Sequence, residues 1–193
     1  MTLASEVRRK AFHMLSLAFL AAYHWIGYPR VLVPAAGWML LVCIVEAARL
    51  KRPDLNRRLM APFDAIPRAE EARRVSGIFH TSAGCLLVML FFGDRPALVS
   101  AAILCLALGD AAAALAGRLW GRHKIMAGRK SLEGSAACWT VSLFCALWTG
   151  FPAGPCAAAA TAATLIELLP NNEWSNDNLW MPVAFAAALY HLA

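Results

Sequence analysis

Apolar stretches recur along the chain, each bounded by charged residues, glycine or proline, and most approach one membrane thickness in length. About 20 consecutive apolar residues are enough for a helix to cross a bilayer. The pattern therefore predicts seven helices, over residues 11–26, 31–50, 77–92, 96–116, 132–149, 153–169 and 179–193. We expect an all-α polytopic integral membrane protein with about seven transmembrane helices, forming a single domain over residues 1–193.

The composition supports a membrane protein and argues against a soluble one. Of the 193 residues, 60% are hydrophobic and 16% are charged. The mean hydropathy is +0.55, which is far more apolar than an ordinary water-soluble domain. The formal net charge of +6 comes from basic side chains that flank the apolar stretches. Because membrane insertion requires such flanking charges, we expect no nucleic-acid partner.

The basic residues also predict how the helices are oriented. Sixteen of the 18 Lys and Arg residues lie before the first helix, between residues 49 and 74, or between residues 118 and 130. Because basic loops tend to stay in the cytosol, the N-terminus and the loops 51–74, 117–131 and 170–178 are expected to be cytosolic. The 51–74 loop is either a short amphipathic element on the inner leaflet or a solvated connector.

A small set of ionisable residues lies inside or at the edge of the apolar helices. Each costs on the order of 2.5 to 3.5 kcal/mol in a membrane and therefore needs a partner or a function. The set is His13, Glu46, His80, Asp110, Glu133 and Glu167, with Asp177 in the last cytosolic loop. All lie near the cytosolic side, so one cytosol-facing site could contain them. Pairing between helices is an equal alternative for Glu46 and Glu167, and a structural role is preferred for His80.

The segment 117–131 has the composition of a phosphate-binding loop, although its spacing is not that of a Walker loop. Glycine lets backbone N–H groups approach oxyanions, basic side chains neutralise them, and a helix N-terminus adds partial positive charge. The residues expected to bind phosphate are Arg118, Arg122, Lys124, Arg129, Lys130 and Ser131. The alternative is a loop whose basic residues serve only the membrane topology.

Carboxylates beside a phosphate site are typical ligands of Mg2+. Asp110 and Asp177 are the first candidates, and Glu133 is the third. Asn178 can add a neutral oxygen ligand or a hydrogen bond to the nucleotide. The sequence therefore predicts a magnesium site next to the phosphate-binding loop.

A helix face near the N-terminus carries Glu6, Arg9 or Lys10, and His13 through i, i+3, i+4 and i+7 spacing. This face enters the membrane at its cytosolic edge, where His13 could accept a proton from an alcohol held at the interface. The alternative is a histidine hydrogen-bonded to a neighbouring helix.

Taken in order, these residues resemble the CTP-dependent lipid-alcohol kinase family, which includes dolichol kinase, phytol kinase and the CTP-using diacylglycerol kinase. The matching pieces are Glu6-x-x-Arg9-Lys10-x-x-His13, Glu46-x-x-Arg49, Gly109-Asp110, Gly117-Arg118, Gly121-Arg122-His123-Lys124, Lys130-Ser131-Leu132-Glu133-Gly134-Ser135 and Asp177-Asn178-Leu179 followed by Pro182. The resemblance implies a Mg2+-dependent, all-helical membrane enzyme that transfers the γ-phosphate of CTP to a lipid hydroxyl. Related phosphatidate cytidylyltransferases share part of the pattern, but their C-terminal Gly-His-Gly-Gly stretch is missing from this sequence.

The residues and the resemblance together assign the site. The expected catalytic residues are His13, Asp110, Lys130 and Glu133. The expected nucleotide ligands are Arg118, Arg122, Lys124, Arg129, Lys130, Ser131 and Asn178, and the expected metal ligands are Asp110, Asp177 and Glu133. The lipid substrate is expected near Lys10, His13, Glu46 and His80. The resemblance implies a polyprenol, a phytol-like isoprenoid or diacylglycerol as acceptor, and the active site is expected to face the cytosol.

Two other functions stay open. One is a cytidylyltransferase that forms a CDP-lipid, and the other is a non-catalytic membrane transporter with a basic vestibule. The short, nearly uncharged outer loops weigh against the transporter, because a one-sided site suits an enzyme. The spacing Gly117-x-x-x-Gly121 permits close helix packing within or between chains, so a homo-oligomer is also expected as an option.

Overall fold

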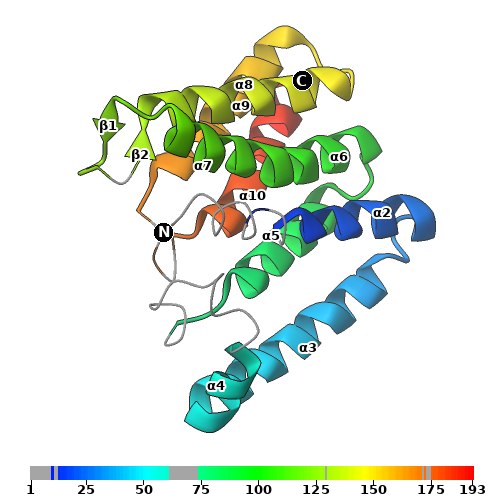
Figure 1. Cartoon of the computed structure of the whole chain (residues 1–193). Coiled ribbons are helices and arrows are strands. Elements are labelled where there is room, and N and C mark those ends of the chain that lie inside the picture. Colours follow the sequence, from blue (N-terminus) through cyan, green and yellow to red (C-terminus); the bar gives the residue numbers. More distant parts are fainter. Residues whose placement is uncertain (1–9, 11–12, 61–73, 129, 171, 173–174) are drawn as a thin grey trace.

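The computed structural model describes residues 10, 13–60, 74–128, 130–170, 172 and 175–193. In chain order the elements are η1 (Met14–Ser16), α2 (Leu17–Ile26), α3 (Leu32–Lys51), α4 (Pro53–Met60), α5 (Gly77–Phe92), α6 (Pro96–Leu104), the π-helix η4 (Cys105–Gly109), α7 (Asp110–Leu119), β1 (Lys124–Ile125), β2 (Lys130–Ser131), α8 (Leu132–Trp148), α9 (Ala153–Leu168) and α10 (Asp177–Leu192). The predicted all-α architecture is confirmed, since the strands of the described residues form only a small hairpin (Figure 1).

Each of the seven predicted segments coincides with a helix or with consecutive helices, within a few residues at either end. In the described part of the chain, Leu32–Lys51 and Pro96–Leu119 are long and apolar enough to cross a membrane. The shorter apolar helices are Met14–Ile26, Gly77–Phe92, Leu132–Trp148 and Ala153–Leu168. Seven crossings and a cytosolic N-terminus therefore stay predictions.

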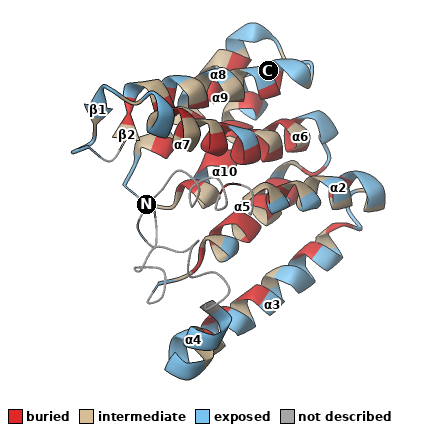
Figure 2. Cartoon of the chain, viewed as in Figure 1, coloured by how far each residue is buried: buried red, intermediate tan, exposed pale blue. Residues whose placement is uncertain are grey.

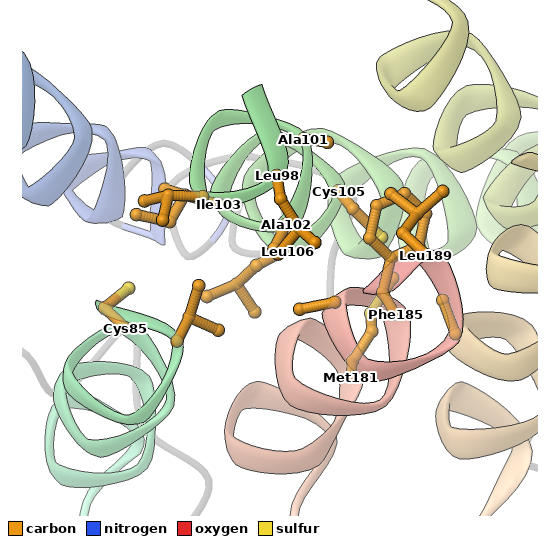
Figure 3. Packing of buried hydrophobic residues seen from close by; sticks show 14 of the residues in the cluster. Cys85, Leu98, Ala101, Ala102, Ile103, Cys105, Leu106, Met181, Phe185 and Leu189 are labelled. Carbon is orange, nitrogen blue, oxygen red and sulfur yellow. The ribbon is translucent and has the colours of Figure 1, made fainter. Parts of the chain in front are cut away.

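The hydrophobic core lies between α5, the continuous α6–η4–α7 helix, and α10. Buried residues concentrate along the α6–η4–α7 segment and α10, as Figure 2 shows. Apolar side chains from these helices gather between them, among them Cys85, Leu98, Ile103, Leu106, Met181, Phe185 and Leu189 (Figure 3). Helices α8 and α9 pack on each other and on α7 and α10, which closes the other side of the bundle.

Helix α3 stands out from the bundle and keeps a large apolar surface exposed (Figures 1 and 2). Val33, Leu40 and Ile44 are all more than half exposed on this helix. A contiguous apolar face of this kind is unfavourable in water but is what a lipid-facing helix presents. The exposed face and the apolar helices indicate a membrane protein.

Glycines let α7 and α8 approach each other closely at the end where the 117–131 loop begins. A Cβ added at Gly134 would lie 2.7 Å from the backbone oxygen of Ala113. One added at Gly121 would lie 2.7 Å from Ser131 Oγ and 2.1 Å from the backbone oxygen of Gly117. The Gly117-x-x-x-Gly121 spacing therefore serves packing within the chain, and a homo-oligomer stays a prediction.

The segment 51–74 begins with a short amphipathic helix, α4. Arg49, in the last turn of α3, donates hydrogen bonds to Asn56 Oδ1 at 3.1 Å and to the Arg74 carbonyl at 2.6 Å. The two ends of the segment are thus tied to the end of α3. Residues 61–73 lie outside the described residues, and the position of the segment on a membrane surface stays a prediction.

Candidate functional site

The basic hairpin, Glu167 and Asp177 lie at one end of the bundle, and Asp110 lies farther along α7, at its first residue. The hairpin, the start of α8 and the start of α10 lie on the same side of the molecule in Figure 1, together with the end of α7. Short connections between antiparallel helices produce this arrangement, because every second connection returns to the same end. It is the end for which the basic loops predict a cytosolic location.

Asp110 is a buried acid that Lys10 and His13 both approach. It is the first residue of α7 and directly follows the π-helix η4, a local widening of the helix that often marks functional sites. Asp110 is 7% exposed and Lys10 is 6% exposed, and the Lys10 ammonium contacts Asp110 Oδ2. His13 Nε2 lies 3.4 Å from the same carboxylate oxygen and 3.2 Å from the Leu106 carbonyl. The structure thus brings two predicted site residues, Lys10 and His13, to a third, Asp110, which lies about 100 positions further along the sequence.

Lys130, in β2, points toward two further buried carboxylates. Its Nζ lies 2.5 Å from Glu167 Oε1, at the end of α9, and 3.8 Å from Asp177 Oδ2, at the start of α10. Glu167 and Asp177 are both buried, and Glu167 is within electrostatic range of Asp177 and of Asp110. The two sets of charged residues therefore form one charged region across α7, α9 and α10.

Glu167 belongs to this region although the sequence did not assign it to the site. In the sequence Glu167 stands out only as a single acidic residue in the alanine-rich stretch 153–168. That pattern equally well indicates a group that pairs helices. The structure makes it the closest carboxylate partner of Lys130. A pairing across 37 residues of sequence depends on helix packing, which the local pattern does not contain.

The described part of the loop 117–131 folds into a hairpin, from which Arg118, Arg122 and Lys124 reach solvent. Strand β1 pairs antiparallel with β2, with Lys124 opposite Ser131, and Met126, Ala127 and Gly128 turn the chain with positive φ. Ser131 caps α8 by accepting a hydrogen bond from the Gly134 N–H at 3.2 Å. The capped helix N-terminus and the loop therefore lie side by side, as a phosphate site requires.

The predicted phosphate ligands of this loop differ in exposure. Arg118, Arg122 and Lys124 are exposed, whereas Lys130 is partly buried and Ser131 is buried. The Lys124 ammonium donates to the Gly117 carbonyl at 3.4 Å. Arg129 lies outside the described residues. An anion approaching from solvent would meet the three exposed cations first and Lys130 last.

Glu133 fastens this loop to α8. Its carboxylate accepts hydrogen bonds from the backbone N–H groups of Arg122 and His123, both at 3.1 Å, and lies 2.8 Å from His123 Nδ1. These contacts hold the backbone of the loop over the first turn of α8. The catalytic and metal-binding roles of Glu133 stay predictions.

Glu46 ties the end of α3 to the start of α5, and His80 bonds within the start of α5. Glu46 accepts two hydrogen bonds from Arg49, at 2.6 and 2.9 Å, and one from the Ser76 N–H at 3.0 Å. His80 Nδ1 lies 2.9 Å from the Ser76 carbonyl. For Glu46 this is the pairing role that the sequence left as an equal alternative. Lipid binding by Glu46 and His80 stays a prediction.

Asn178 lies between the acidic region and α5. It follows Asp177 in the first turn of α10, and its Nδ2 lies 3.8 Å from the position of a Cβ added at Gly77. Its backbone N–H donates to Asn176 Oδ1 and Asp177 Oδ1. The side chain thus borders the start of α5, and its role as a nucleotide ligand stays a prediction.

The donor atoms of the acidic region have the chemistry that Mg2+ prefers. In the described part of the chain, no three His, Cys, Asp or Glu side chains lie close enough together to hold a metal ion as they stand. Asp110 and Asp177 nevertheless supply hard carboxylate oxygens within electrostatic range of the Glu167 carboxylate. Glu167 Oε2 is buried and, among the described residues, has no hydrogen-bond partner. An unsatisfied buried carboxylate oxygen is unfavourable, so the region fits an additional cation.

The geometry defines a class of site: Lys130 of the basic hairpin pairs with buried carboxylates next to a capped helix N-terminus and exposed cations, an arrangement suited to a phosphorylated ligand. The chain is 27% identical over 191 residues to the protein named phytol kinase from Synechocystis sp., in an alignment covering 94% of this chain and 77% of that protein. No family model matches the chain, and comparison with solved structures gives no match. The similarity relates the chain distantly to a lipid kinase.

Proposed function

We propose that the protein is a CTP-dependent kinase that transfers the γ-phosphate to the hydroxyl of a membrane lipid alcohol at the cytosolic face. The observation that carries the proposal is the pairing of buried carboxylates with lysines, Asp110 with Lys10 and Asp177 with Lys130, the latter in the basic hairpin itself. The similarity to a phytol kinase supports a lipid alcohol as acceptor. A polyprenol, a phytol-like isoprenoid and diacylglycerol are the candidate acceptors, since each has one hydroxyl above an apolar tail.

The basic hairpin is the proposed place for the triphosphate. Arg118, Arg122 and Lys124 are exposed to the aqueous side and would neutralise its charge. Arg129, Lys130, Ser131 and Asn178 complete the proposed nucleotide set. Phosphoryl transfer depends mainly on positioning and charge neutralisation, so a loop held rigidly by Glu133 is suited to it.

Asp110 and Asp177 are the proposed ligands of Mg2+, with Glu133 as a third candidate. Both aspartates are buried next to lysines that contact their oxygens. Bound Mg2+ would supply neutralisation of the charge that develops on the phosphate oxygens. The task of the protein itself is to keep these carboxylates ionised and correctly oriented, which the two lysines favour.

The lipid hydroxyl is proposed to lie beside His13. The imidazole is next to Asp110, so a hydroxyl held there would be close both to a group able to accept its proton and to the acidic region. Lys10 would orient Asp110 from the same segment. Glu46 and His80 are the proposed lining of the lipid path, near the ends of α3 and α5.

The proposal is tested with purified protein in lipid nanodiscs that contain isoprenoid alcohols, diacylglycerol and phosphatidic acid. CTP labelled at the α phosphorus and CTP labelled at the γ phosphorus are supplied separately, each with Mg2+. Label from the γ position in an alcohol product supports the kinase and identifies its acceptor. Label from the α position in lipid would instead establish the cytidylyltransferase, and no label from either position would favour the transporter.

The side of the membrane on which CTP acts is tested with sealed vesicles of both orientations. Inside-out vesicles expose the cytosolic face and are expected to incorporate γ label from external CTP. Activity confined to right-side-out vesicles would contradict the cytosolic location of the site.

A further inference from the structure

Glu167 is a buried acid to which the proposed function assigns no role. Its side chain is 6% exposed, and its Oε1 accepts the Lys130 ammonium at 2.5 Å. Its Oε2 is buried and lacks a hydrogen-bond partner among the described residues. One carboxylate therefore has one oxygen occupied by an ammonium and a second oxygen available to a further cation.

The Lys130 ammonium lies between two buried carboxylates. Glu167 Oε1 and Asp177 Oδ2 both reach it, at 2.5 and 3.8 Å. Lysine is a compact charge on a flexible four-carbon stem, and Lys130 belongs to the strand paired with β1 of the basic hairpin. The ammonium can therefore turn from the carboxylates toward the hairpin without a change of fold.

We propose that Glu167 is a positioning residue that holds Lys130 and exchanges this ammonium for a divalent cation when phosphate binds at the hairpin. The inference rests on the proposed function, which assigns the hairpin to phosphate. Phosphate draws Lys130 outward, and the vacated carboxylates of Glu167 and Asp177 then accept the cation. Cation and phosphate consequently strengthen each other's binding, and the coupling is reciprocal.

The first test measures Mn2+ binding to purified protein in detergent, without nucleotide, by electron paramagnetic resonance. Lys130→Met removes the competing ammonium, so the dissociation constant for Mn2+ is expected to fall about tenfold. Lys124→Met is the matched control, because it removes a lysine of the same hairpin whose ammonium donates to a backbone carbonyl. The double variant Lys130→Met/Glu167→Gln is expected to lose the gain. Equal tightening in the control, no tightening in Lys130→Met, or an undiminished gain in the double variant would each overturn the exchange.

A second measurement uses Glu167→Gln alone and keeps the inference testable if Lys130→Met does not fold. Releasing Lys130 is expected to tighten binding of inorganic pyrophosphate in EDTA several-fold, while Mn2+ binding weakens. A residue with only a structural role would weaken both. Loss of pyrophosphate binding in Glu167→Gln would therefore refute the holding of Lys130 by Glu167.

These outcomes are distinguishable from failure of the proposed function. If Lys130→Met binds Mn2+ more tightly but wild-type protein transfers no γ label, the exchange of Lys130 for a cation is supported and the proposed kinase activity is refuted. If γ label is transferred but neither variant changes cation or pyrophosphate binding as expected, the kinase stands and the exchange is refuted.

Discussion

The ion pair between Lys10 and Asp110 provides the sharpest test of the site, because it joins the N-terminal segment to α7. The perturbations are Asp110→Asn and Lys10→Met, made singly and together. Each keeps the approximate volume of the side chain and removes one charge. Both partners are almost fully buried, so each single substitution leaves the other charge buried without its counter-ion.

The expected magnitude follows from this burial. Two unit charges about 4 Å apart interact by about 4 kcal/mol at an effective dielectric constant of about 20. Removing one partner of a buried pair typically costs about 3–5 kcal/mol of unfolding free energy. The double variant buries neither charge, so it should be more stable than the sum of the single effects predicts. We expect a coupling energy of about 3 kcal/mol, at the upper end for contacting residues.

The assay is unfolding in mixed detergent micelles followed by tryptophan fluorescence, combined with γ-label transfer. Asp54 and Arg57 in α4 form the matched control, a pair 3.6 Å apart whose side chains are 89% and 82% exposed. Their coupling should stay below about 1 kcal/mol. If Asp110→Asn is too unstable to purify, recovery of folded protein in the double variant reports the same coupling.

Two results would refute this reasoning. A coupling energy near zero between Lys10 and Asp110 would mean that the N-terminal segment does not rest on α7 in the folded protein. Turnover at the wild-type rate in purified Asp110→Asn would remove Asp110 from the proposed catalytic machinery. The expected loss of turnover is about 10²- to 10³-fold, typical for removal of one charge-stabilising group.

Three further substitutions test other parts of the site and the fold. Lys130→Ala should abolish detectable γ-label transfer while CTP-independent properties such as helix content by circular dichroism persist; wild-type kinetics would exclude Lys130 from catalysis. Glu133→Gln should raise KM for CTP more than it lowers kcat, because it weakens the anchoring of the hairpin backbone; an unchanged KM would contradict that anchoring role. Gly134→Ala should lower the unfolding free energy by about 1–3 kcal/mol through overpacking, whereas Gly37→Ala, which meets nothing within 4 Å, should not destabilise the protein; equal effects of the two would contradict the close α7–α8 contact.

The helices could be predicted from the sequence because their apolar stretches are long and their boundaries are marked by charge, glycine or proline. The range 77–92 matches α5 residue for residue. The π-helix before Asp110 and the β1–β2 hairpin were not predicted. The strands are two residues long, too short for an alternating pattern, and the π-helix lies in an apolar run without a distinguishing residue.

The burial of charged residues was easier to predict than their pairing. The cost of burying a charge selected Asp110 from the sequence alone, since a lone acid in an apolar helix needs a reason to be there. That Lys10 would pair with it, and that Lys130 would contact Glu167, depends on the rotation and depth at which the helices pack. These are tertiary quantities, so the sequence supplied the charges and the structure supplied their pairing.

The distribution of charge along α7 gives the proposed reaction a direction. Asp110 begins this helix and Leu119 ends it, so the acid lies about 13 Å along the axis from the basic loop. The buried region holds the carboxylates of Asp110, Glu167 and Asp177 against the ammonium groups of two lysines, while the exposed cations lie on the hairpin. A triphosphate from the aqueous side is attracted to the hairpin and repelled by the deeper carboxylates unless a cation accompanies it. In the proposed reaction the terminal phosphate would stop at the boundary between the two regions, and the lipid hydroxyl proposed to lie beside His13 would approach it from the opposite side.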